Sequence, residues 1–375
     1  MTYRACLLVS LLALGCSSSP ASVAPGGDAG VDASSCAQGS LVKGACEGAL
    51  TVAASDQTIA PARDHHTTFI RQTSQGPYLY VVGGTSAWNA MYTDIQRAKI
   101  QEDGSLLAFE KVADLPDGRA GHSTIVVGDT LIVIGGVYGT ASPKGTTRST
   151  VTAKFSPDGG LSGFAPGPDL PLDVMHFSAT LHDGFVYVFG GRTTTGTDGS
   201  TTMAASAKVA EDGTLGPFTA LAPLTPDRSH HAAFVVKDTL YLVGGITGSP
   251  MGNPPSRTDV VRAKLLPGGA IAAFEPSGTL PTGISVSAAQ TYGDYVYIFG
   301  GLVDGVSGGP YTNQIFRARV QPDGALSPFT TIDATLSVKR AHVHQTPVYK
   351  KFIYSVGGLG NNGKSIGTID VGTFD

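Results

Sequence analysis

Short apolar runs that each end in two glycines recur along the chain. The six runs are "YLYVVGG", "LIVIGG", "VYVFGG", "LYLVGG", "YIFGG" and "IYSVGG". Their glycine pairs are Gly83–Gly84, Gly135–Gly136, Gly190–Gly191, Gly244–Gly245, Gly300–Gly301 and Gly357–Gly358. Near-continuous apolar character over so few residues, followed by glycine, predicts strands that are buried on both faces.

The interval between successive glycine pairs is nearly constant. The second glycines stand at positions 84, 136, 191, 245, 301 and 358, so the intervals are 52 to 57 residues. A period of this size is typical of repeat proteins whose unit is one four-stranded propeller blade. We therefore predict an all-β fold, a six-bladed β-propeller of four-stranded blades over residues 36–375.

Each repeat contains further landmarks that predict its four strands. A first strand begins near an "RxxH" element, the apolar run is the second, and a variable loop leads to the third. An Asp-Gly turn, as in "DGSLLAF", then leads to the fourth, because glycine accepts the positive φ of a tight hairpin. We expect the glycine pairs to lie where the blades converge, so that a side chain on either glycine would meet the next blade.

The two ends of the chain complement each other. The last repeat ends at "GTIDVGTFD", one strand short of a full blade. The segment "EGALTVAASDQTIAPAR" has the same interval from Gly48 to Arg63 as the first repeat has from Gly104 to Arg119. We therefore expect the N-terminal segment to supply the outermost strand of the last blade, which closes the ring and removes exposed sheet edges.

The apolar runs with paired glycines resemble the Kelch-repeat family over residues 48–375. The chain departs from the family in having Ala–Lys or Ala–Arg in the third strand, where the family has a tyrosine. In place of the family's tryptophan it has Phe109, Phe164, Phe218, Phe274 and Phe329. The resemblance is therefore to divergent bacterial Kelch-like propellers, and it implies the fold without implying a particular activity.

The N-terminus indicates export. An apolar stretch from Ala5 to Leu14 follows Arg4 and is too short to span a bilayer as a permanent helix. Residues 1–16 resemble a bacterial lipoprotein signal peptide that ends at a lipidated Cys16; an ordinary secretory signal is the alternative. The resemblance implies an outer-membrane lipoprotein, on the periplasmic or surface face, because Ser17 is not the aspartate that signals inner-membrane retention. Residues 17–35 are small and polar, which predicts a flexible tether.

Cysteine usage fits an exported protein. Beyond Cys6 and Cys16 the chain has only Cys36 and Cys46. In an oxidising compartment we expect these two to form a disulfide, with a metal site as the alternative. No cysteine follows Cys46, so the cysteine–tyrosine cofactor of galactose-oxidase-like propellers is excluded.

Arginines recur at the start of four repeats and suggest a binding site. In an antiparallel blade the "RxxH" elements and the variable loops lie on one rim, and the first loop contains Trp88, the only tryptophan. Structural hydrogen bonding to the backbone is one interpretation of the arginines, and a ring that binds an anionic ligand is the other. The predicted ligand-binding residues are Arg63, Trp88, Arg119, Arg228 and Arg340.

The pattern favours a binding protein over an enzyme. The net charge of −4 and the lack of a basic run argue against nucleic-acid binding. No glutamate falls in the variable loops, and sialidase boxes are absent. We expect a monomeric, surface-tethered module for a glycan, peptide or envelope partner, without cofactor or metal. A carbohydrate-active enzyme, such as the sugar epimerases or mutarotases found on a related Kelch propeller, is the alternative, and no catalytic residue is assigned.

Overall fold

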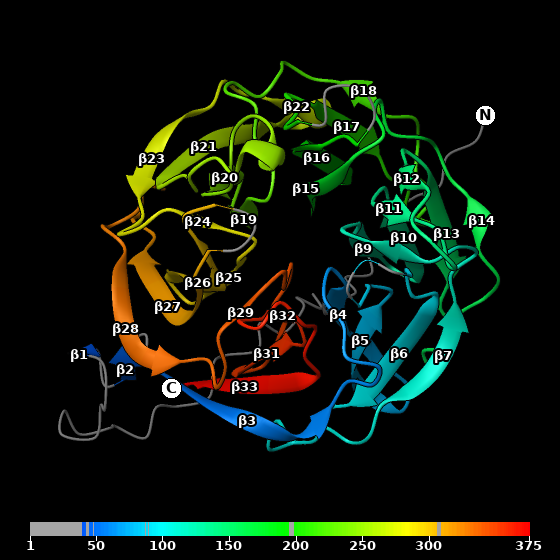
Figure 1. Ribbon diagram of the computed structural model, residues 1–375, viewed down its shortest axis with the longest axis horizontal. Helices are drawn as coiled ribbons and strands as arrows, with labels where there is room; N and C mark the ends of the chain where they lie inside the picture. The colour runs from blue at the N-terminus through cyan, green and yellow to red at the C-terminus, as the bar shows by residue number, and fades with distance from the viewer. Residues whose placement is uncertain are drawn as a thin grey trace, which may run out of the picture.

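The protein is built almost entirely from antiparallel strands arranged around a central axis. The computed structural model describes residues 40–42, 45–47, 49–86, 88, 90–194, 199–305 and 309–375. Figure 1 shows successive sheets following one another around the axis, which is the arrangement of a β-propeller. The all-β, propeller-type fold predicted from the repeats is therefore confirmed. The helical elements of the described part are short 3₁₀ turns, η2 (Pro250–Gly252) and η3 (Pro267–Gly269).

The first three repeats each form a four-stranded sheet. The first contains β4 (Thr67–Thr73), β5 (Gly76–Val82), β6 (Asp94–Lys99) and β7 (Glu110–Asp114). The second contains β9 (Ser123–Val127), β10 (Thr130–Ile134), β13 (Thr150–Lys154) and β14 (Ala165–Pro166). The third contains β15 (Met175–His182), β16 (Phe185–Arg192), β17 (Ala204–Lys208) and β18 (Thr219–Ala220).

The remaining sheets follow the same order with small additions. The fourth contains β19 (Ala232–Val236), β20 (Thr239–Val243), β21 (Asp259–Leu266), β22 (Ala270–Ile271) and β23 (Glu275–Thr279). The fifth contains β24 (Ile284–Ser285), β25 (Ala288–Tyr292), β26 (Tyr295–Val303), β27 (Tyr311–Arg319) and β28 (Thr330–Thr335). Short pairings at the rim involve β8 (Arg119–Ala120), β11 (Val137–Tyr138), β12 (Gly145–Thr146), β29 (Arg340–Ala341) and β32 (Leu359–Gly360). A separate pair is formed by β1 (Ser40–Val42) and β2 (Ala45–Glu47).

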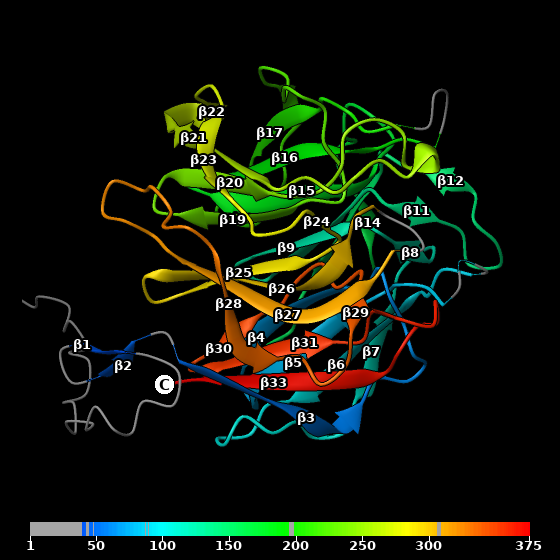
Figure 2. The ribbon, with the colours of Figure 1, turned by 60° about the vertical axis from the view of Figure 1, so that its left-hand side comes forward.

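The sheet of the last repeat contains residues from both ends of the described chain. Its strands are β30 (Val348–Tyr349), β31 (Phe352–Val356), β33 (Thr368–Phe374) and β3 (Leu50–Thr58). β3 runs antiparallel along the outer side of β33, with Leu50 opposite Phe374 (Figure 2). Leu50 is buried against Phe374 and Ile353, so this pairing is held by side-chain packing as well as by backbone hydrogen bonds.

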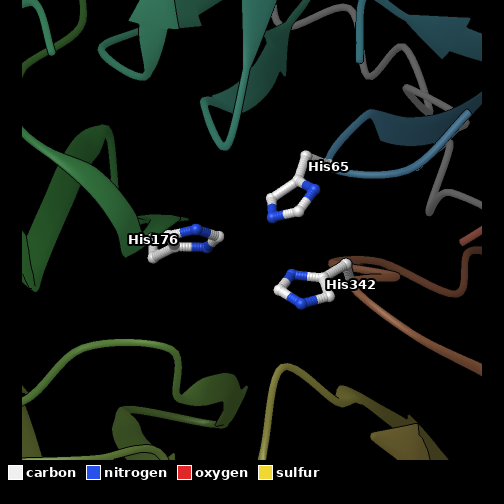
Figure 3. Close-up of side chains that lie close together, drawn as sticks. All are labelled: His65, His176 and His342. Carbon is white, nitrogen blue, oxygen red and sulfur yellow. The ribbon is translucent and has the colours of Figure 1, made fainter. Parts of the chain in front are cut away.

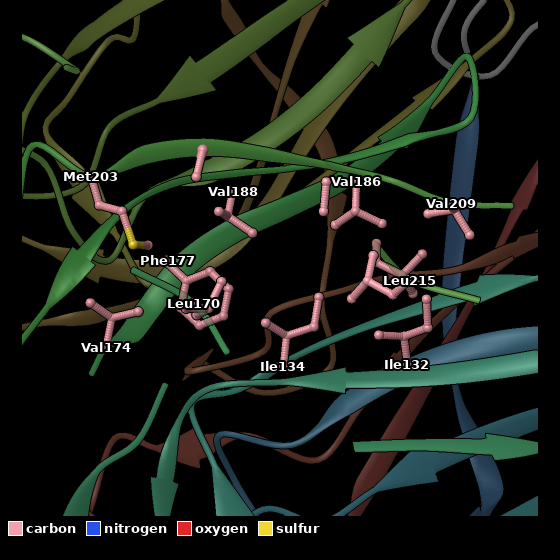
Figure 4. Packing of buried hydrophobic residues seen from close by; sticks show 13 residues of the cluster. Ile132, Ile134, Leu170, Val174, Phe177, Val186, Val188, Met203, Val209 and Leu215 are labelled. Atoms are coloured by element: carbon pink, nitrogen blue, oxygen red, sulfur yellow. The ribbon is translucent and has the colours of Figure 1, made fainter. Parts of the chain in front are cut away.

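The apolar second strands are buried because each is covered by a sheet on either side. Ile132 and Ile134 of β10 pack against Val186 and Val188 of β16 in the neighbouring sheet (Figure 4). Burying a branched side chain of this size contributes about 1.5–3 kcal/mol relative to leaving it exposed. The runs that lack alternation in the sequence therefore supply the main packing surface between repeats. No helix in the part of the chain that the structure describes is long and apolar enough to cross a membrane.

The two glycines of each pair have different neighbours. A Cβ on Gly190, the first of its pair, would lie 2.2 Å from the carbonyl oxygen of Arg228 in the next repeat. A Cβ on Gly191, the second, would lie 2.9 Å from the carbonyl oxygen of Met175 in its own repeat. The expectation that both glycines face the next blade is correct for the first glycine and wrong for the second. The first allows close approach between repeats, and the second lets the chain pass its own first strand.

Alanine at Gly190 tests the role of this close approach. Gly190 and Gly128 both have left-handed backbones, at φ +63° and +53°, but a Cβ on Gly128 would meet nothing within 4 Å. Gly128→Ala should cost about 1 kcal/mol through backbone strain, and Gly190→Ala about 2–4 kcal/mol because overpacking is added. Urea unfolding measures both variants, and equal losses would contradict the proposed contact.

Candidate functional site

Six residues with left-handed backbones surround the axis, one from each repeat. They are His65, Gly121, His176, His230, Val286 and His342, with φ between +48° and +61°. The N–H of each donates to the carbonyl oxygen of its counterpart in the preceding repeat, at N···O distances of 2.8–3.2 Å. His65 donates to His342, so the six hydrogen bonds form a closed cycle. We call these residues the axial ring.

Four of the six axial side chains are histidines, and they pack against one another. The ring centroids of His65 and His342 lie 4.0 Å apart, those of His176 and His230 also 4.0 Å, and those of His65 and His176 4.9 Å. All four are at most 6% exposed. Burial lowers the pKa of each imidazole well below its usual value, so all four are neutral at neutral pH.

Three of these histidines face a common space. One ring nitrogen from each of His65, His176 and His342 lies within 4.8 Å of one from each of the others (Figure 3). Nδ1 of His65 contacts the carboxylate of the buried Asp64. Neutral imidazoles are common ligands of transition metals, so this cluster, which the sequence analysis missed, could hold a metal ion. The missed signal is that the three histidines occupy the same position in three different repeats.

A pocket of about 520 Å³ opens above the axial histidines. It is lined by at least one residue from the segment after each glycine pair, including Trp88, Val137, Thr194, Pro250, Tyr311 and Leu359. The variable loops and the "RxxH" elements thus share one face, as predicted from strand order. We call this cavity the mouth pocket.

Trp88 forms part of the wall of the mouth pocket. Its side chain is 37% exposed, and its ring lies 4.4 Å from that of His65 in an edge-on arrangement. The cationic side chain of the pocket is Arg192, and no aspartate or glutamate is among the described residues that line it. The pocket therefore combines aromatic and aliphatic surface with neutral imidazoles.

The four predicted arginines lie away from the mouth pocket. Arg63, Arg119, Arg228 and Arg340 are at most 4% exposed. Each donates to the carbonyl oxygen of the first glycine of its own repeat, at 2.9, 3.0, 2.6 and 2.8 Å respectively. Three of them also pair with the carboxylates of Asp94, Asp259 and Asp370. Burial lowers the pKa of Arg119 to about 10, which leaves it protonated at neutral pH.

The arginines therefore have the structural role that the sequence analysis considered, and the ligand-binding role predicted for them is wrong. Their guanidinium groups donate to the carbonyl oxygens of the first glycines. Of the predicted set, only Trp88 lines the pocket. Cys16 and Cys36 lie outside the described residues, as does the side chain of Cys46 in β2, so the lipid anchor and the disulfide stay predictions.

Removing one arginine should affect stability. Arg340 and Asp370 form an ion pair with both side chains 1% exposed, and Nη1 of Arg340 also contacts three backbone carbonyls. Arg340→Ala should destabilise the fold by about 3–5 kcal/mol, since it leaves a carboxylate buried without its partner. Arg148 pairs with Asp173 at the surface, where its side chain is 48% exposed.

Arg148→Ala is the matched control, and its cost should be at most about 1 kcal/mol. Chemical denaturation of both variants provides the measurement. Similar denaturation midpoints for the two variants would show that the buried Arg340–Asp370 pair stabilises the fold no more than the surface Arg148–Asp173 pair does.

Comparisons with known proteins agree with this architecture. No family model matches the chain. A stretch of 189 residues, 50% of this chain, is 24% identical to Beta-scruin from Limulus polyphemus, of which the match spans only 19%. The solved structure of YjhT superposes with a TM-score of 0.62 at 14% identity, covering 83% of this chain and 95% of that one. Beta-scruin is a Kelch-repeat protein and YjhT is a Kelch-type propeller, so both likenesses agree with a divergent Kelch-like propeller fold for this chain.

Proposed function

We propose that the chain is an exported binding module, in which a closed six-bladed propeller presents the mouth pocket to a ligand. The observation that carries this proposal is the pocket itself, with a wall residue from every repeat and Trp88 at its side. Its volume of about 520 Å³ lies in the range typical of small-molecule sites. Long, variable loops on a rigid scaffold are where binding sites are usually placed.

Closure of the ring is supported by three contacts between the first and last repeats. His65 donates its N–H to His342, β3 pairs with β33, and Gly357 packs against the carbonyl of Arg63. Each of these contacts joins residues separated by most of the chain. A closed ring holds the six loops at fixed positions, which pre-organises the pocket for its ligand.

Among the candidate ligands, a sugar ring fits the mouth pocket best. Trp88 and Tyr311 present aromatic surface against which the apolar face of a sugar can pack. Thr194 and the axial imidazoles supply the few polar groups that fix orientation. A peptide or another envelope component is the other class of ligand that the same loops could take.

A carbohydrate-active enzyme such as an epimerase or mutarotase is the second candidate function. Imidazoles at the floor of the pocket favour it, because they can donate and accept protons. The lack of a carboxylate among the described lining residues favours binding without catalysis. Following the anomers of each bound sugar by NMR distinguishes the two, since a binding module leaves the rate of interconversion unchanged.

Trp88→Ala tests the binding site. The full chain is applied to glycan and peptide arrays, and the affinity for the best ligand is then measured by calorimetry. We expect Trp88→Ala to weaken binding about tenfold or more, because aromatic side chains that a ligand covers dominate such sites.

Leu181→Ala is the matched control, because Leu181 has the same 37% exposure and lies outside the pocket. It should bind as the unmodified chain does. Unchanged affinity in Trp88→Ala, or an equal loss in Leu181→Ala, would place the ligand elsewhere.

We also propose that a lipid on Cys16 anchors the chain, that residues 17–35 form a flexible tether, and that Cys36 and Cys46 form a disulfide. Acyl chains anchor a protein through about 0.8 kcal/mol for each buried CH₂. Mass spectrometry of the mature protein without reductant should find a diacylglyceryl cysteine at the N-terminus and two hydrogens fewer for the disulfide. A mature chain that begins with an unmodified residue would contradict the anchor, and a full count of thiol hydrogens would contradict the disulfide.

A further inference from the structure

The hydrogen-bonded axial ring does not explain its histidines. Gly121 and Val286 adopt the same left-handed backbone and make the same hydrogen bonds as the histidines. Valine is more strained than histidine in this conformation, so the cycle does not require histidine at these positions. The side chains of the histidines are therefore free to serve a purpose of their own.

The three facing histidines have buried nitrogens without protein partners. Within the described part of the chain, Nε2 of His65, Nδ1 of His176 and Nδ1 of His342 make no hydrogen bond. The three side chains are 1%, 3% and 6% exposed. Buried polar atoms are normally paired, and leaving one without a partner is unfavourable. A single cation between the rings would satisfy all three.

Asp64 orients the first of these histidines. Its carboxylate is 1% exposed and accepts hydrogen bonds from Nδ1 of His65 and from the hydroxyl of Ser365. This fixes the proton of His65 on Nδ1 and leaves Nε2 as a lone-pair donor, as in the carboxylate–histidine–metal arrangement. The equivalent positions of the other repeats have no carboxylate, being Ala120, Met175, Ser229, Ser285 and Ala341.

We propose that His65, His176 and His342 bind Zn²⁺ at the floor of the mouth pocket. Three neutral imidazoles with an open fourth position are a common zinc environment. The nitrogens lie within 4.8 Å of one another, and tetrahedral ligation at about 2.1 Å requires about 3.4 Å. Rotation of the three rings would have to close this difference, and one nitrogen of each ring has no hydrogen bond that a rotation would break.

The fourth coordination position of the proposed zinc ion would face the mouth pocket, because of the residues that surround the three histidines. All three histidines line that pocket, whereas His344 lines a second cavity formed by the first strands of the repeats. The centroid of His344 lies 5.4 Å from that of His176, so it covers the other side of the cluster. Arg192 also lines the mouth pocket, and its charge disfavours a cation there. The carboxylate of Asp64 offsets that charge from behind His65.

Zinc titration of the full chain tests the site without any knowledge of the pocket's ligand. Untagged, metal-stripped protein should bind one Zn²⁺ with a dissociation constant below about 1 μM, measured by calorimetry. His176→Asn and His342→Asn should each weaken binding about 100-fold. Asparagine is chosen because it tolerates the left-handed backbone, which preserves the axial ring.

His230→Asn is the matched control. His230 has the same backbone conformation and stacks on His176, but it lies outside the three-histidine cluster. Its zinc affinity should stay within about threefold of the unmodified chain. Asp64→Asn should weaken zinc binding about 10- to 100-fold while zinc-free melting changes little, as expected of a positioning residue.

The outcomes separate this proposal from the proposed function. Absence of stoichiometric zinc binding by the unmodified chain, or an equal loss in His230→Asn and His176→Asn, would overturn the site. If an asparagine variant at His176 or His342 does not fold, the unmodified chain and Asp64→Asn still decide. Trp88→Ala should bind zinc as the unmodified chain does while its affinity for the ligand of the mouth pocket falls, so failure of one proposal does not imply failure of the other.

Discussion

The cycle of backbone hydrogen bonds at the axis is the constraint on which the rest of the structure depends. Each link joins the start of one repeat to the start of the next, and the link from His65 to His342 joins residues separated by most of the chain. The cycle requires a left-handed backbone at all six positions, and proteins tolerate this in histidine and glycine far better than in most residues. Valine at one position shows that the surrounding contacts are strong enough to impose the conformation.

Around this cycle, crowding determines which residue types are possible. The first glycine of each pair lies against the backbone of the next repeat, and its own carbonyl accepts a hydrogen bond from a buried arginine in four of the repeats. A guanidinium group suits this task because it donates in several directions within one plane and stays charged when buried. The carboxylates that pair with three of the arginines compensate for the removal of their charge from water.

The same geometry brings the candidate site together. Because every repeat begins at the axis and continues from its glycine pair into a variable loop, every repeat contributes at least one loop residue to the mouth pocket, and four repeats also contribute an axial histidine. Repetition of the backbone thus leaves the side chains at equivalent positions free to differ. The histidines of the three-residue cluster come from three of the six repeats, and only His65 is preceded by an aspartate, Asp64. A symmetric scaffold therefore contains an asymmetric site. Asymmetry of this kind allows a pocket to orient its ligand.

The sequence by itself determined the repeats, the all-β class, the propeller-type fold and the buried second strands, because these follow from local periodicity and from glycine at turns that require a positive φ. It also identified the rim on which Trp88 lies, since strand order in an antiparallel sheet decides which connections share a face. Only the tertiary structure decided what the recurring arginines and histidines do. In the sequence Arg63 and His65 are both polar and lie within one "RxxH" element, which strand order places on a single rim. In three dimensions the arginine turns towards the carbonyl of Gly83, while the histidine faces two others from distant repeats. The direction in which a side chain points near the crowded axis depends on packing between repeats, and no local sequence pattern encodes that packing.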